Sequence, residues 1–310
     1  MEGMVVKSTG SWYTVRLSNG NYLKCRIKGK FRIQSLKSTN PIAVGDQVII
    51  KQEGQDYLIT NILQRKNYII RRSVNLSKQV HIIASNMDQA FLIVTLSSPK
   101  TSVGFIDRFL VTAEAYQIPT VLVFNKIDLY DSFDREYHNK LIEIYARASY
   151  DCIEVSALTK HNVNLLLDRM KDKVTLIAGH SGVGKSTLVN AIDPTLDLAT
   201  QKVSVAHQKG MHTTTFAEMF AIQSGGFIID TPGIKGLGLV DMEDIELSDY
   251  FPEIRRHKQA CKFHNCKHVN EPKCAVKIAV EAEEIHPNRY YSYPSMLEDD
   301  GKQYRESKYH

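Results

Sequence analysis

The sequence predicts a chain of three domains: a small N-terminal β-barrel, a central α/β domain and a short, helical C-terminal region. Three observations support this prediction. Short strand-like runs separated by turn residues fill about the first seventy positions, whereas apolar strands and helical spacing alternate from residue 90 onward. Near the end of the chain, three cysteines and a histidine fall within fourteen residues, between Cys261 and Cys274.

Length and composition are those of an ordinary globular protein. The 310 residues are 43% hydrophobic and 24% charged, which leaves room for two or three domains with cores of their own. No apolar segment is long enough to span a membrane, and the N-terminus lacks the succession typical of a signal peptide. We therefore expect a cytoplasmic protein with no membrane partner. The five cysteines fit a metal site and two buried thiols better than a disulfide framework.

The first domain, expected over residues 1–70, has the pattern of β-structure. Strands expected at 12–17 and 22–31 flank Asn19-Gly20, a pair favoured in two-residue hairpin turns. A further hairpin is expected at 45–50 and 57–60. Five or so short strands in about seventy residues indicate a small closed barrel of the oligonucleotide-binding type, or OB-fold.

Positive charge is concentrated in this first domain. Residues 1–72 contain thirteen Lys or Arg against four acids, in a chain whose net charge is +5. Cations alternate with apolar residues along the strand expected at 22–31, so that one face displays Lys24, Arg26, Lys28, Lys30 and Arg32. The run from Gly3 to Gly45 contains no acid, which favours nucleic-acid binding; a solvated charged face on a structural barrel is the alternative.

A polar, basic stretch at 65–79 is expected to link the barrel to the α/β domain, which we place at residues 71–238. This domain should contain a parallel sheet because its strands are separated by helices. The expected strands are 90–96, 120–124 and 152–155, with a helix at 103–116.

The α/β domain contains a phosphate-binding loop. The apolar run 174–178 predicts a buried strand, which leads directly into Gly179-x-x-x-x-Gly184-Lys185-Ser186 at the start of a helix. Glycines let successive N–H groups face an anion, the lysine can reach the outer phosphates, and the serine hydroxyl can bind Mg²⁺. The residues expected to contact nucleotide here are Gly179, His180, Ser181, Gly182, Val183, Gly184, Lys185, Ser186 and Thr187.

The tetrapeptide Asn125-Lys126-Ile127-Asp128 follows an expected strand and predicts the base of the nucleotide. The Asp128 carboxylate can accept hydrogen bonds from the ring N–H and the exocyclic amine of guanine, an arrangement that adenine does not offer. Asn125 is expected to hold the purine edge and the loop together, and the Lys126 stem to lie along the ring. After the next strand, Ser156-Ala157 should bring the Ala157 N–H to the guanine oxygen.

Elements for Mg²⁺ and the γ-phosphate are expected after the phosphate loop. A strand at 227–230 ends in Asp230-Thr231-Pro232-Gly233, where the carboxylate can hold Mg²⁺ through water and the Gly233 N–H can contact the terminal phosphate. The polar stretch 201–215 is expected to be a mobile switch with a Mg²⁺-binding threonine. The predicted magnesium ligands are Ser186, Thr214 and Asp230. The sequence does not distinguish Thr214 from its neighbours Thr213 and Thr215 for this role.

The cluster of Cys261, Cys266, His268 and Cys274 supplies three thiolates and one imidazole. Four such ligands close a tetrahedral Zn²⁺ site with no open position, so we predict one structural zinc per chain; His264 is a rival ligand. This domain is expected over residues 239–310, with a helix at 274–282 and a polar tail. Its cations form either a second RNA contact or a solvated face: Lys258, Lys262, Lys267, Lys273 and Arg289.

The order of these motifs is unusual. Ordinary GTPases carry the phosphate loop first and Asn-Lys-x-Asp and Ser-Ala last, whereas here the last two come first, so the domain is circularly permuted. With a basic barrel ahead and the Cys/His cluster behind, this order resembles the bacterial ribosome small-subunit-dependent GTPase A family over essentially the whole chain. One departure is Met211, which stands where the family usually has an arginine.

The resemblance implies a GTPase that binds the small ribosomal subunit and its rRNA, acts in late maturation and hydrolyses GTP to leave. GTP or GDP would bind with Mg²⁺, and we expect a monomer when the protein is free. Ile234 follows Gly233 and cannot orient water as the glutamine of many GTPases does. The resemblance implies His212 for that role; an exposed loop histidine is the alternative.

Two other functions compete with this interpretation. In the first, the protein is an RNA-binding chaperone in which GTP is a structural ligand. In the second, it is a kinase of a small molecule with the same phosphate loop, which the guanine-recognition tetrapeptide argues against.

Overall fold

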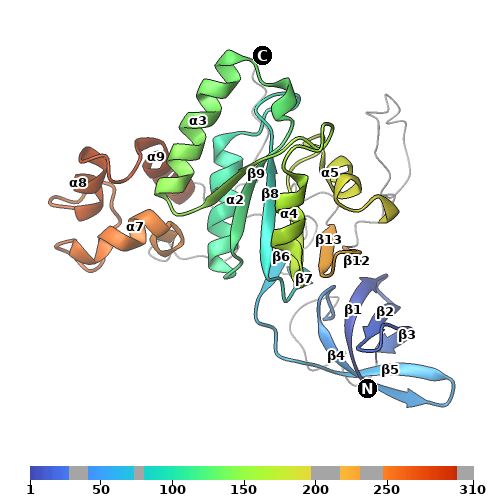
Figure 1. The fold of residues 1–310 in the computed structure, drawn as a ribbon. Coiled ribbons are helices and arrows are strands. Elements are labelled where there is room, and N and C mark those ends of the chain that lie inside the picture. Colours follow the sequence, from blue (N-terminus) through green and yellow to red (C-terminus); the bar gives the residue numbers. More distant parts are fainter. Residues whose placement is uncertain (28–40, 73–79, 197–216, 231–246, 299–310) are drawn as a thin grey trace, which may run out of the picture.

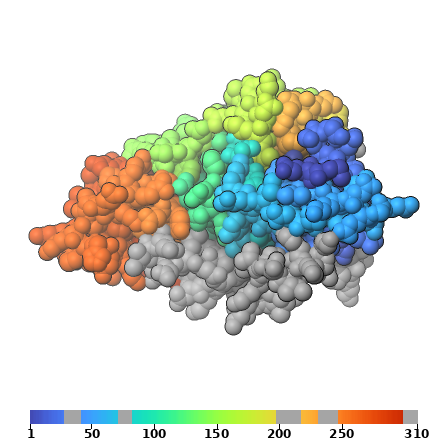
Figure 2. Space-filling view, turned by 90° about the horizontal axis from the view of Figure 1, so that it is seen from below, coloured from blue at the N-terminus to red at the C-terminus, as the bar shows by residue number. Residues whose placement is uncertain are grey.

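Eleven strands form one continuous sheet that passes from the α/β domain into the barrel, in the order β10-β9-β8-β11-β13-β12-β1-β2-β3-β5-β4. The computed structural model describes residues 1–27, 41–72, 80–196, 217–230 and 247–298. Figure 1 shows the barrel below the α/β domain and the C-terminal helices to one side of it. Seen from below, the barrel and the C-terminal helices lie at opposite ends of the molecule (Figure 2).

The N-terminal barrel closes because β1 pairs with both β2 and β4. All its pairings are antiparallel except that of β3 with β5, and the alternating residues Val5, Val15, Cys25 and Ile59 fill its interior. The OB-fold prediction is confirmed. The strands are β1 (Glu2–Ser8), β2 (Tyr13–Leu17), β3 (Tyr22–Ile27), β4 (Gln47–Glu53) and β5 (Asp56–Ile62).

The α/β domain is built on parallel strands that are buried on both faces. Along β8, Phe91 and Ile93 pack into the cluster beneath α4 and α5, while Leu92 and Val94 pack beneath α2 and α3. Such strands are apolar along their whole length, which is why the sequence revealed them. The strands are β8 (Gln89–Val94), β9 (Thr120–Phe124), β10 (Asp151–Glu154), β11 (Val174–Ala178) and β13 (Phe227–Asp230), with β12 (Glu218–Ala221) antiparallel to β13.

Among the described residues, four helices cover this sheet, and two of them were not predicted. They are α2 (Val103–Ala115), α3 (Ser132–Arg147), α4 (Val163–Met170) and α5 (Lys185–Ile192), of which α3 and α4 were missed. The side chains of Ser102 and Asp131 accept hydrogen bonds from backbone N–H groups in the first turns of α2 and α3. These caps fix where the two helices begin.

The expected linker at 65–79 is wrong in part, because it includes a strand. β6 (Tyr68–Arg72) pairs antiparallel with β7 (Val80–Ser85). Beside this hairpin, buried Asp46 of the barrel accepts hydrogen bonds from Arg65 Nε and Ser85 Oγ, both at 2.6 Å. A carboxylate with charged and neutral donors on both sides of the junction fixes the barrel against the α/β domain.

The C-terminal region packs against α2 through a buried arginine. Its helices are α7 (Pro252–His257), α8 (Ala275–Glu281) and α9 (Pro287–Leu297). The Arg289 side chain is 1% exposed and donates to Glu253 Oε1 and to Asp107 Oδ1 on α2, both at 2.6 Å. Burial alone would lower the pKa of Arg289, but the two carboxylates raise it well above its usual range. Arg289 is therefore neither an RNA contact nor part of a solvated face, and that expectation is wrong for this residue.

Arg289→Met should loosen the C-terminal helices, because it leaves the carboxylates of Asp107 and Glu253 buried without their cation. We expect the free energy of unfolding of these helices to fall by about 3–5 kcal/mol, measured as faster amide hydrogen exchange in α9. Arg255→Met is the matched control, since Arg255 is exposed and its contact with Glu114 is 3.5 Å long. Equal exchange rates in the two variants would show that the buried pairs do not hold this interface.

Candidate functional site

The loop between β11 and α5 has the curled backbone that the glycines predicted. Gly179, Gly182 and Gly184 have φ angles of +139°, +86° and +92°. A Cβ at Gly179 would lie 2.7 Å from the Ile93 carbonyl oxygen, so glycine is required there for close packing as well. The loop thus presents its backbone N–H groups at the start of a helix, which is a favourable arrangement for phosphate.

Opposite charges face each other beside this loop. Lys185 Nζ donates to the carbonyl oxygens of Gly179 at 2.7 Å and His180 at 2.9 Å. Burial lowers the pKa of Lys185, and the nearby Asp230 opposes this effect; burial raises the pKa of Asp230, and Lys185 opposes it. A phosphate beside Lys185 and a cation beside Asp230 would each stabilise the charged form, so both groups fit a Mg²⁺-bound nucleotide.

Asn125 connects the guanine-recognition tetrapeptide to the phosphate loop. Its Nδ2 donates to the Val183 carbonyl oxygen at 2.9 Å, and its Oδ1 accepts from the Ala157 N–H at 3.1 Å. Three segments that are distant in the sequence are therefore joined through one buried amide. The Ala157 N–H has this protein partner here, and its contact with a guanine oxygen stays a prediction.

Asp128 lies exposed on the 3₁₀ turn Ile127–Leu129, where its carboxylate is oriented by a neighbouring hydroxyl. Ser156 Oγ donates to Asp128 Oδ1 and accepts from the Thr159 N–H at 3.1 Å. Lys126 Nζ donates to the Gly182 carbonyl oxygen at 2.8 Å, so the lysine stem runs from the base motif toward the phosphate loop. The tetrapeptide is thus positioned at the same edge of the sheet as the loop.

One wall of this site was missed by sequence reasoning. It is the loop between β8 and α2: Thr101 Oγ1 lies 2.9 Å from His180 Nε2, and a Cβ at Gly182 would meet Pro99 at 3.1 Å. The ring of Phe105 also meets the His180 ring edge-on, with centroids 5.4 Å apart. No local pattern in the sequence marks this wall, because it follows from β8 and β11 being neighbours in a parallel sheet, where the loops after them lie side by side.

The Cys/His cluster of the C-terminal region converges on one point. The donor atoms of Cys261, Cys266, His268 and Cys274 all lie within 4.8 Å of one another, and His268 Nδ1 is 3.4 Å from Cys274 Sγ. His264 is exposed and does not belong to the cluster. The thiols of Cys261 and Cys274 are 3.9 Å apart, well beyond the disulfide bond length of about 2.05 Å.

Burial acts in opposite ways on the two kinds of ligand in the cluster. It lowers the pKa of His268, so the imidazole is neutral and can act as a ligand, whereas it raises the pKa of Cys266 to about 12, so this thiol would bind a metal with release of its proton. Tyr290 Oη donates to the His268 carbonyl oxygen at 2.8 Å and Tyr293 Oη to that of Lys267 at 2.9 Å. These contacts anchor the ligand loop to α9, and the four residues can hold a metal.

Family models match nearly all of the barrel and the α/β domain. The model described as RsgA GTPase matches residues 62–240, and the one described as RsgA N-terminal domain matches residues 2–57. This chain belongs to the RsgA GTPase family. The predicted nucleotide-binding motifs, in their permuted order, therefore lie within the residues that the GTPase model matches.

Curated relatives cover the whole chain. The small ribosomal subunit biogenesis GTPase RsgA of Christiangramia forsetii is 55% identical over 100% of this chain and 99% of its own length. Its counterpart from Bacteroides fragilis (strain YCH46) is 54% identical over 96% and 97%.

Solved structures agree with the permuted fold. YjeQ from Thermotoga maritima matches with a TM-score of 0.79 at 37% identity, covering 96% of this chain and 97% of that one. YloQ, a circularly permuted GTPase, matches with a TM-score of 0.73 at 32% identity, over 96% and 93%. The prediction of a permuted GTPase domain is confirmed.

Several predicted site residues lie outside the described part of this RsgA chain. They are His212, Thr213, Thr214, Thr215, Gly233, Lys28, Lys30 and Arg32. Their roles stay predictions. Lys24 and Arg26 lie exposed on β3, as the alternating pattern predicted. In the described ranges, no helix is both long and apolar enough to cross a membrane.

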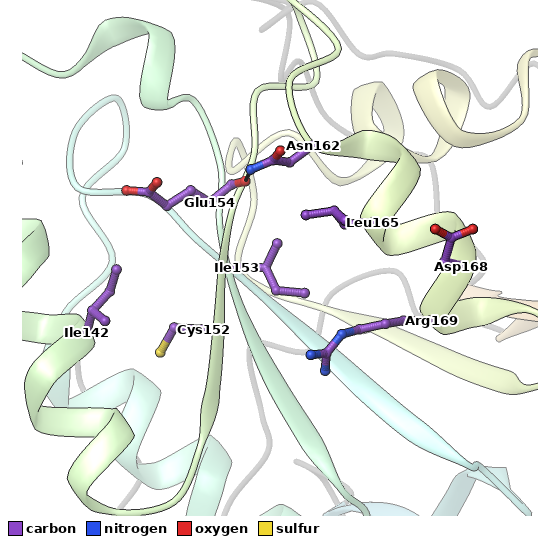
Figure 3. A pocket seen from close by; sticks show the side chains of 8 residues that line it. All are labelled: Ile142, Cys152, Ile153, Glu154, Asn162, Leu165, Asp168 and Arg169. Atoms are coloured by element: carbon purple, nitrogen blue, oxygen red, sulfur yellow. Dashed lines mark hydrogen bonds between the residues drawn. The ribbon is translucent and has the colours of Figure 1, made fainter.

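A hollow of about 520 Å³ lies between α3, β10 and α4 (Figure 3). Apolar Ile142, Ile153 and Leu165 line it, and Arg169 at its rim pairs with Asp151 at 2.6 Å. None of the predicted nucleotide contacts lines it. Asn162 Nδ2 crosses its upper edge to the Glu154 carbonyl oxygen at 3.0 Å, which ties α4 to the strand before Ser156.

Asp128→Asn should lower GTP affinity about a hundredfold or more and favour xanthosine triphosphate, because an amide donor at this position matches the xanthine oxygen and not the guanine amine. Nucleotide titrations with GTP, XTP and ATP measure the change. Asp168→Asn, an exposed acid on α4, is the control and should bind GTP like the original chain. Equal binding of ATP and GTP by the unmodified protein would contradict the assignment of guanine.

Proposed function

We propose that this member of the RsgA family binds the small ribosomal subunit and its rRNA during late maturation and hydrolyses GTP to leave it. The observation that carries the proposal is the Asn125 bridge, which joins a guanine-recognition motif to a phosphate loop in one site. Full-length relatives named small ribosomal subunit biogenesis GTPases support the choice of partner. We place the protein in the cytoplasm as a monomer when free.

Each domain has a part in this proposal. The barrel at 1–70 contacts rRNA, the permuted domain at 71–238 binds GTP or GDP, and the region at 239–310 binds zinc and ends in a polar tail. Lys185 neutralises the outer phosphates; Ser186 and Thr214 bind Mg²⁺, and Asp230 holds it through water. The N–H of Gly233 contacts the γ-phosphate. Loss of this phosphate on hydrolysis is therefore transmitted along the chain that continues to α7.

Hydrolysis requires a group that orients the attacking water. Ile234 has an aliphatic side chain that cannot do so, and we assign this role to His212 in the stretch 201–215. Docking on the subunit would bring the imidazole toward the γ-phosphate. The free protein should therefore hydrolyse GTP slowly.

We assign the metal of the C-terminal cluster to Zn²⁺, one ion per chain. Three thiolates and an imidazole are the donor set of structural zinc sites, and four protein ligands leave no position for a reacting water. The ion would stabilise a segment whose apolar core is small, including Phe251, Ile254 and Val276.

A second candidate function is an RNA-binding chaperone that uses GTP as a structural ligand. The basic barrel face favours it, since Lys24 and Arg26 need no hydrolysis to bind RNA. The two functions differ in turnover: a structural ligand is not consumed faster when subunits are present.

Cys274→Ser should remove zinc from the purified protein and unfold the C-terminal helices, while GTP binding persists because none of the four zinc ligands belongs to the nucleotide site. Metal analysis and GTP titration provide the two readouts. Cys152→Ser is the control, since Cys152 lies on β10 outside the cluster. The zinc assignment fails if protein prepared without chelators contains no stoichiometric zinc.

The rate of GTP hydrolysis should be slow for the protein alone. It should rise when small ribosomal subunits are added and stay unchanged when large subunits are added. His212→Ala should keep GTP and subunit affinity yet lower the stimulated kcat about a hundredfold, because a transition-state contact is lost and ground-state binding is not. His207→Ala, from the same stretch, is the matched control.

Two results would count against this mechanism. Hydrolysis that does not respond to small subunits would favour the chaperone. Full stimulation of the His212→Ala variant would move the water-orienting role to another group.

A further inference from the structure

The outer face of β2 and β3 combines aromatic rings with cations. Inward-pointing Tyr13, Val15 and Cys25 are buried in the barrel, so the alternate residues point outward. Among these, Trp12, directly before β2, is 40% exposed and Tyr22 on β3 is 56% exposed. Lys24 and Arg26 occupy the same outer face, which lies on the barrel at the lower end of the molecule (Figure 1).

Trp12 is held in place by its own turn and by Arg26. The Trp12 carbonyl oxygen accepts from the Thr9 N–H at 2.9 Å and from Thr9 Oγ1 at 3.2 Å. Because Tyr13 is paired with Cys25 in the register of β2 and β3, Trp12 comes beside Arg26. The Arg26 guanidinium carbon lies 3.9 Å from the centroid of the indole ring, which is a close cation–π contact.

The charge of this face is not compensated by the described residues around it. Lys7 on β1 pairs with Glu218, but in the described ranges no carboxylate pairs with Lys24 or Arg26. A polyanion would supply the missing charge, and a tryptophan that is two-fifths exposed would gain from a planar, apolar ligand. Unpaired RNA offers both properties, because phosphates flank bases whose faces are free.

We propose that Trp12, stacked on Arg26, is a platform for one unpaired base of an RNA strand, while Lys24 contacts a neighbouring phosphate. This inference rests on the proposed function and sharpens it, because it replaces general attraction to RNA with recognition of a single-stranded segment. A duplex keeps its base faces covered and presents phosphates alone. The barrel should therefore prefer single strands even though no base edge is read.

The chain contains one tryptophan, so its fluorescence reports directly on this position. A single-stranded oligouridylate of about twelve nucleotides, the size that an OB-fold accommodates, should quench the emission in a saturable way. A G·C-rich RNA duplex and inorganic polyphosphate should quench it far less at the same ionic strength. Equal quenching by polyphosphate or by duplex would overturn the proposal.

Variants separate stacking from charge. Binding of oligouridylate is measured by the fluorescence anisotropy of a labelled strand. Trp12→Ala should weaken this binding about five- to a hundredfold and leave polyphosphate binding unchanged. Trp12→Phe keeps a ring and should retain most of the affinity, whereas Lys24→Ala should weaken binding of all three probes and reduce the salt dependence. Phe133→Ala removes an exposed ring from α3 and serves as the control.

The two proposals can fail separately. Unchanged oligouridylate affinity in Trp12→Ala would sink the platform, even if small subunits stimulate GTP hydrolysis in that variant as in the original chain. Conversely, specific quenching by single strands would support the platform in a protein whose hydrolysis ignores the subunit. GTP binding by every variant verifies that the α/β domain is intact, and the retained affinity of Trp12→Phe verifies that a substitution at this position leaves the barrel folded.

Discussion

The parallel pairing of β8, β11 and β13 is the constraint on which the rest of the nucleotide site depends. Parallel strands end at the same edge of a sheet, so the loops that follow them meet there whatever their order along the chain. The permuted motif order therefore leaves the site intact. Asn125 shows this directly, since its amide reaches the Val183 carbonyl oxygen across 58 positions of sequence.

Because the parallel strands bring these loops together, their backbones must approach closely, which requires glycine at the point of contact. A Cβ at Gly184 would lie 2.6 Å from Asn125 Nδ2, so the amide bridge can form only against a glycine. The same glycine adopts a positive φ at the start of α5, where its neighbouring N–H groups face outward. One residue thus serves both the shape of the phosphate loop and its connection to the base motif.

Buried charge joins the other two bodies to the α/β domain. Asp46 accepts hydrogen bonds from Arg65 and Ser85 at the barrel junction, and Asp107 accepts one from Arg289 at the C-terminal interface. Both carboxylates are fully buried, so separating the bodies would expose or orphan charges that are stable only in pairs. The proposed RNA and metal regions are therefore held in fixed positions around the nucleotide site.

The sequence by itself determined the parts that depend on neighbouring residues. Alternation around Cys25 predicted the barrel strand, the apolar run before Gly179 predicted β11, and the donor types at Cys261 and Cys274 predicted a metal site, because each pattern is local. The tertiary structure alone decided which distant groups meet. It brought Thr101 to His180, chose His268 over His264, and buried Arg289, which local composition had placed among exposed cations. Such contacts depend on how the strands are ordered in the sheet and how the helices pack on it, which no local pattern encodes.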